Sequence, residues 1–223
     1  MIIVSKPASI ARRRNKMAAS NATNPSLMRT RKLTGLAIFT AVIVVLQILC
    51  TFVRIGPFSI TLALTPIVIG AAVYGAGSGA FLGFVMGLVV LITGILGWDG
   101  GTVNYLISIN AVSTILLCML KSIVAGWAAG AVYKILARKS ILLGVIAAGI
   151  VCPVVNTGLF ILLLSLFFRS TLEVWAGGTS VMHYTIISLT GINFLIELLV
   201  NLGLASVITR IIKSGVKKLR LEK

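Results

Sequence analysis

A lysine, a glutamate and three asparagines lie within the apolar stretches of this chain, and their types suit the binding of a small polar molecule. Asn193, Glu197 and Asn201 follow one another at a spacing of four residues, which places them on one face of a helix. Lys121 and Asn156 each lie within a separate apolar stretch. A cation, a carboxylate and amides together can hold a solute through charge-assisted hydrogen bonds.

These side chains fall at similar depth if the apolar stretches cross a membrane as helices. Lys121 and Asn156 each lie roughly 20 Å along a helix from the same side of the membrane, and Glu197 falls near the middle. Ionisable residues inside a membrane are costly and usually functional. We therefore predict that Lys121, Asn156, Asn193 and Glu197 form a substrate-binding site. The alternative is a buried Lys121–Glu197 pair that only joins two helices.

Catalytic and metal-binding signals are sparse. His183 is the only histidine, and Cys50, Cys118 and Cys152 lie in apolar stretches without CxxC spacing. The sequence contains no P-loop for nucleotide hydrolysis. We expect neither enzyme activity nor a metal or cofactor. Such a chain must take energy from another protein or only equilibrate its solute.

The composition predicts the class of protein that positions these residues. Hydrophobic residues make up 58% of the 223 positions, charged residues 11%, and the mean hydropathy is +1.11. A soluble domain carries about 25% charged residues. Because a span needs about 20 residues, we predict an all-α membrane protein, a six-transmembrane-helix bundle. The predicted spans are residues 34–53, 60–74, 78–96, 104–135 (starting between 104 and 110), 141–168 and 184–212.

The basic residues predict the orientation. Seventeen of the 20 lysines and arginines lie in the head, in the loop between the fourth and fifth spans, or in the tail. The positive-inside rule then places both termini in the cytoplasm (N-in/C-in) of a multi-pass protein of the cell membrane. This clustering explains the net charge of +16 without nucleic acid as a partner. We divide the chain into a disordered basic N-terminal head, residues 1–28, and a transmembrane substrate-binding domain, residues 29–223.

Two further features concern the helices themselves. Pro66 lies within the second span and is expected to kink or break it. Glycines recur every four residues in the third and fourth spans, a spacing that lets helix backbones approach closely. They are Gly79, Gly83 and Gly87, followed by Gly126 and Gly130.

Several segments, taken in order, resemble one family. They are Ala37–Ala41, the stretch from Ile60 to Gly70, Gly79–Gly83, Cys152–Gly158 and Asn193–Asn201. Over residues 29–220 they resemble the substrate-binding S components of energy-coupling factor (ECF) vitamin transporters. Within that family the chain is most similar to the pantothenate-type members.

The resemblance implies a bundle that binds a vitamin at its outer face, best matched by pantothenate, a small anion. It also implies partners: an ECF transmembrane coupling protein, docked on Ala37 and Ala41, and two cytoplasmic ATPase subunits that drive import. Three alternatives stay open. The chain could be an autonomous small-solute transporter or channel, a structural membrane subunit, or an S component for another vitamin such as riboflavin or folate.

Overall fold

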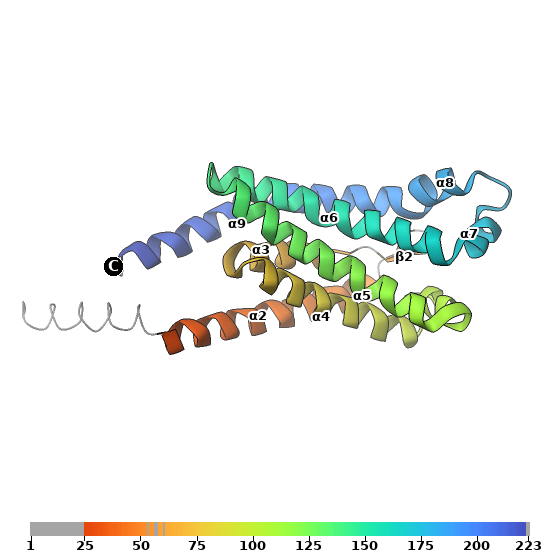
Figure 1. The fold of residues 1–223 in the computed structure, drawn as a ribbon, viewed down its shortest axis with the longest axis horizontal. Coiled ribbons are helices and arrows are strands. Elements are labelled where there is room, and N and C mark those ends of the chain that lie inside the picture. Colours follow the sequence, from red (N-terminus) through yellow and green to blue (C-terminus); the bar gives the residue numbers. More distant parts are fainter. Residues whose placement is uncertain (1–24, 53, 56–57, 60, 222–223) are drawn as a thin grey trace, which may run out of the picture.

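The computed structural model describes residues 25–52, 54–55, 58–59 and 61–221. Within these ranges the chain is helical apart from turns and one short hairpin (Figure 1). Side chains are described except at residues 25, 54, 55, 58, 59, 188–190, 192, 193, 211 and 213–221. The predicted all-α class is confirmed.

Each predicted span overlaps at least one described helix. Four of the described helices, α2, α4, α5 and α6, are long and apolar enough to cross a membrane, and α3 is apolar but shorter. The elements are α2 (Pro25–Thr51), β1 (Arg54–Ile55), β2 (Phe58–Ser59), α3 (Leu64–Tyr74), α4 (Ala76–Ile95), α5 (Thr102–Leu136), α6 (Ile141–Phe167), α7 (Arg169–Ala176), α8 (Val181–His183), the π-helix η1 (Tyr184–Gly191) and α9 (Ile192–Leu221).

Several bounds differ from the sequence prediction: α5 starts at Thr102, before the predicted 104–110, and α9 runs to Leu221, beyond the predicted residue 212. Residues 25–28, which we assigned to a disordered head, belong to α2, and residues 1–24 lie outside the described part. The second span was predicted to start at residue 60, but α3 starts at Leu64 after the antiparallel β1–β2 hairpin. Pro66 therefore lies in the first turn of α3, where its missing N–H breaks no helical hydrogen bond.

The long helices run side by side along the long axis of the molecule (Figure 1). The start of α2, the α5–α6 connection and the end of α9 lie at one end, on the left of Figure 1. The hairpin, the α4–α5 turn and α7 lie at the opposite end. Both described chain termini thus share one end, which we call the basic end because Arg29, Arg31, Lys32, Arg138 and Lys139 lie there.

Helix α3 forms the centre of the packing near the basic end. It contacts α2, α4, α5, α6 and α9, and its residues Leu64, Ile67, Val68 and Ala71 are fully buried. Its 11 residues extend only about 16 Å, about half the thickness of a bilayer core. The centre of the bundle beyond Leu64 is therefore not filled by a helix.

The predicted close approach of two glycine-bearing helices is confirmed between α4 and α5. A Cβ atom on Gly79 would meet the carbonyl oxygen of Gly126, and one on Gly83 would meet that of Ser122. These helices approach with backbone against backbone, which a larger side chain would prevent.

Helix α5 is interrupted at Asn110, whose φ of −154° and ψ of 98° are not helical. Its Oδ1 accepts a hydrogen bond of 3.0 Å from the backbone N–H of Ser113, in the manner of a helix N-cap. The break changes the direction of the first part of α5, and residues on both sides of it line the site described next.

Candidate substrate-binding site

A cavity occupies the centre of the bundle on the hairpin side of α3. The space that it leaves for the centre of a water-sized sphere is about 80 Å³, and the total space inside it, open solvent included, is about 830 Å³. Helices α2, α4, α5, α6 and α9 contribute to its wall. The lining residues are Gln47, Thr51, Thr61, Val90, Thr93, Asp99, Val103, Leu106, Leu117, Cys118, Lys121, Asn156, Thr157, Phe160, Phe194 and Glu197.

Lys121 provides the one amine of this lining. Its Nζ lies 4.7 Å from the ring centroid of Phe160 on α6, a cation–π arrangement. Among the described residues, no hydrogen bond or ion pair to this amine is present. The cation is held in position by a ring face, so its N–H groups can donate to an anion in the cavity.

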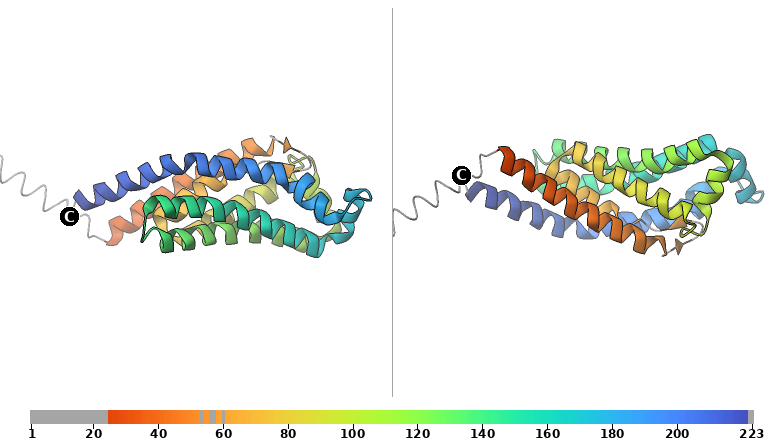
Figure 2. Two further views of the ribbon diagram at one scale, coloured as in Figure 1. Left: turned by 90° about the horizontal axis from the view of Figure 1, so that it is seen from above. Right: turned by 90° about the horizontal axis from the view of Figure 1, so that it is seen from below.

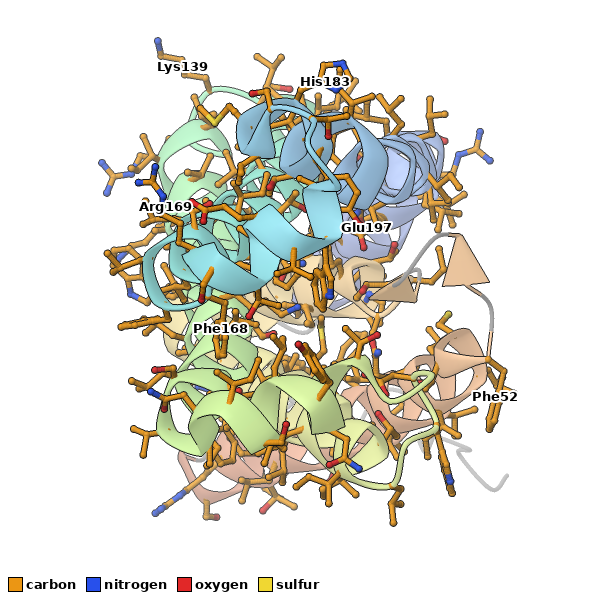
Figure 3. All side chains as sticks on the ribbon, turned by 90° about the vertical axis from the view of Figure 1, so that its right-hand side faces the viewer. Phe52, Lys139, Phe168, Arg169, His183 and Glu197 are labelled. Atoms are coloured by element: carbon orange, nitrogen blue, oxygen red, sulfur yellow. The ribbon has the colours of Figure 1, made fainter. Side chains whose placement is uncertain are left out.

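Glu197 is 5% exposed and lies across the cavity on α9. Its Oε1 accepts a hydrogen bond of 3.1 Å from the backbone N–H of Thr61, just before α3, and its Oε2 has no hydrogen-bond partner. Viewed from the hairpin end, Glu197 lies inside the outline of the bundle and His183 at its edge (Figure 3). Within the described part of the chain, Glu197 forms no ion pair with Lys121 at 4.0 Å or less.

Two amide side chains complete the polar lining. Asn156 on α6 is 4% exposed, Gln47 on α2 is 2% exposed, and the side-chain oxygen of each has no hydrogen-bond partner. With Glu197 Oε2, three buried acceptor oxygens without partners belong to residues that line the same cavity as Lys121. A buried acceptor without a partner costs about 1–3 kcal/mol, which a solute that donates hydrogen bonds would remove.

The sequence analysis identified Lys121, Asn156 and Glu197 but not Gln47. The available signal was a glutamine in the middle of the first apolar stretch, which is as costly in lipid as the asparagines that we did consider. Asn193 lies on α9, but its side chain is outside the described residues.

Two further polar residues near the cavity have structural partners. Asn201 accepts from the Thr65 hydroxyl at 2.9 Å and donates to the Glu197 carbonyl at 3.0 Å, so it fastens α9 to α3. The carboxylate of Asp99 accepts from the backbone N–H groups of Gly101 at 3.0 Å and Val103 at 2.9 Å. Asp99 thereby caps the start of α5, although it also lines the cavity.

The outer face of α2 is largely unpacked. Ala37 and Ala41 are both exposed, and larger apolar side chains around them are exposed as well. Only 17% of the apolar part of this helix is buried within the chain, less than in the other candidate spans. The exposed neighbours are Leu33, Ile38, Val42, Val45 and Leu49.

Comparison with known proteins gives three similarities. The family model "ECF transporter, substrate-specific component" matches residues 31–212. The chain is 29% identical over 183 residues to the pantothenic acid transporter PanT of Lactococcus lactis subsp. cremoris (strain MG1363), covering 78% of this chain and 89% of that protein. Its fold is similar to a solved structure of ThiT from Listeria monocytogenes, with a TM-score of 0.59 and 22% identity, covering 86% of this chain and 98% of that one.

Proposed function

We propose that this chain, which belongs to the family of substrate-specific components of ECF transporters, binds pantothenate and supplies it to an ATP-driven importer. As a member of that family it is a multi-pass membrane protein and a vitamin transporter subunit. The choice of vitamin is supported by the name of the Lactococcus relative and by one observation, a cavity lined by Lys121 together with three residues that carry unpartnered acceptor oxygens.

The chemistry of pantothenate complements this lining. The molecule carries one carboxylate, which can accept from Lys121, and hydroxyl and amide N–H groups, which can donate to Asn156 and Glu197. Because Glu197 Oε1 already accepts from a backbone amide, its charge does not require Lys121 as a close partner. We include Asn193 in the proposed site because it lies one turn before Glu197 on α9.

The proposed topology has six spans in residues 29–223, with residues 1–28 as a basic cytoplasmic head and both termini inside the cell. It is supported by the position of both described chain ends at the basic end (Figure 1). With this orientation the hairpin and the α4–α5 turn face outward, and the cavity beside them would receive its solute from outside.

The proposed partners are an ECF coupling protein in the membrane and two cytoplasmic ATPase subunits. The exposed face of α2 around Ala37 and Ala41 is the proposed docking surface, because small side chains permit close approach of another helix. Hydrolysis of ATP is assigned to the partners, since this sequence contains no P-loop. In this proposal the chain itself is not an enzyme.

The test is to purify the tagged chain in mild detergent from its own cells and to identify what accompanies it. We expect mass spectrometry to find pantothenate in the released small molecules, and the coupling protein and both ATPases among the co-purified proteins. Riboflavin or folate instead would overturn the specificity. Pantothenate uptake by liposomes that contain this chain alone would show an autonomous transporter.

A further inference from the structure

Gln47 is a buried amide whose side-chain oxygen has no evident structural role. Its side-chain oxygen has no hydrogen-bond partner, although the residue is 2% exposed and lies in the middle of an apolar helix. Its backbone carbonyl is used, since it accepts from the Thr51 hydroxyl at 2.7 Å. Gln47 is also one of the residues that line the cavity. A leucine here would avoid the desolvation of an unpaired amide.

Gln47 on α2 and Lys121 on α5 come from different helices to line the same cavity. Helix α2 packs against α4 and helix α9 against α6, and Figure 2 shows α2 crossing the bundle obliquely. Gln47 on α2 and Glu197 on α9 contribute acceptor oxygens, and Lys121 on α5 contributes a cation, to residues that line one cavity. A solute in this cavity can therefore meet both acceptors and a donor.

We propose that Gln47 is a specificity-determining residue, whose side-chain oxygen accepts a hydrogen bond from a hydroxyl of the solute whose anionic group is held by Lys121. The solute class is then a hydroxylated monoanion. This inference rests on the proposed pantothenate-binding function and deepens it. A monoanion without hydroxyl groups would leave Gln47 unpaired and bind less tightly.

The test measures dissociation constants of three probes for the purified full-length chain in detergent. The probes are pantothenate, its alcohol analogue with a hydroxymethyl group in place of the carboxylate, and its dideoxy analogue with both hydroxyls replaced by hydrogen. Gln47→Met keeps the length of the side chain and removes the acceptor. We expect it to weaken pantothenate and the alcohol analogue by about 3- to 10-fold, and to leave the dideoxy analogue unchanged.

Lys121→Met provides the opposite pattern. It should weaken pantothenate and leave the alcohol analogue unchanged, because that analogue has no carboxylate to lose. Cys50→Ala is the control for packing, since Cys50 is buried on the same helix one turn away and does not line the cavity. We expect Cys50→Ala to bind all three probes as the unmodified chain does.

Three results would overturn the inference, and they separate its failure from the failure of the proposed function. If the unmodified chain binds pantothenate and Gln47→Met binds it equally well, Gln47 makes no contact with the solute and the proposed function stands. The same conclusion follows if Gln47→Met weakens all three probes equally, because that loss would not depend on the hydroxyls. If the unmodified chain does not bind pantothenate at all, the proposed function fails and the inference fails with it.

Discussion

Replacement of Lys121 by methionine is the most direct test of the proposed site. Lys121→Met keeps an unbranched side chain of similar length and removes the positive charge. We expect pantothenate to bind roughly 10- to 150-fold more weakly, because a hydrogen bond to a charged group contributes about 1.5–3 kcal/mol. Calorimetric titration of the purified chain measures this loss directly.

The structure also predicts that this variant folds. Lys121 loses its cation–π contact with Phe160, worth about 0.5–2 kcal/mol, but a methionine sulfur can contact the same ring favourably. Glu197 keeps its hydrogen bond from Thr61 and loses no close ion pair. The melting temperature should therefore fall by only a few degrees, which a thermal unfolding assay in detergent measures.

The double variant Lys121→Met with Glu197→Gln separates binding from structural pairing. If the two charges only stabilise the bundle, the double variant should be at least as stable as Lys121→Met and should bind pantothenate normally. If Lys121 contacts the solute, the double variant should fold and still bind poorly. Normal pantothenate affinity in a well-folded Lys121→Met protein would refute the assignment of this residue.

Three other predictions concern packing, docking and topology. Gly83→Ala should destabilise the chain by about 1–3 kcal/mol, because its Cβ would meet the carbonyl oxygen of Ser122 on α5. Gly77→Ala on the same helix is the control and should leave the stability unchanged, because nothing lies within 4 Å of its Cβ position. Thermal unfolding compares the two variants. Ala41→Trp should abolish co-purification of the coupling protein and leave pantothenate binding intact, whereas unchanged assembly and uptake would exclude that face. A reporter fused after Arg138 should give a cytoplasmic signal, and a reporter fused near Gly177 should give an external signal. An external signal after Arg138 would contradict the proposed orientation.

Sequence patterns predicted the features that depend only on residues close together in the chain. A run of apolar residues predicts a helix because lipid offers backbone groups no hydrogen-bond partner, and the bounds of α4 and α6 agree with the prediction to within two residues. The spacing of Gly79 and Gly83 predicts close packing because both glycines lie on one face of a helix, where the missing side chains let another backbone approach. Neither pattern shows that α3 starts at Leu64. The β1–β2 hairpin lies before that start, and its formation depends on where the ends of α2 and α3 lie relative to each other.

The sequence by itself determined that the chain is an apolar helical protein with costly polar residues inside its spans, because burial cost and helical periodicity are properties of each segment. Only the tertiary structure decided which of those residues share a cavity. It brings Gln47 from α2 to the lining that holds Lys121, and gives Asn201 a structural bond to Thr65 instead. The reason is that the rotation of each helix and the short length of α3 are set by contacts between segments, which no single stretch of sequence contains.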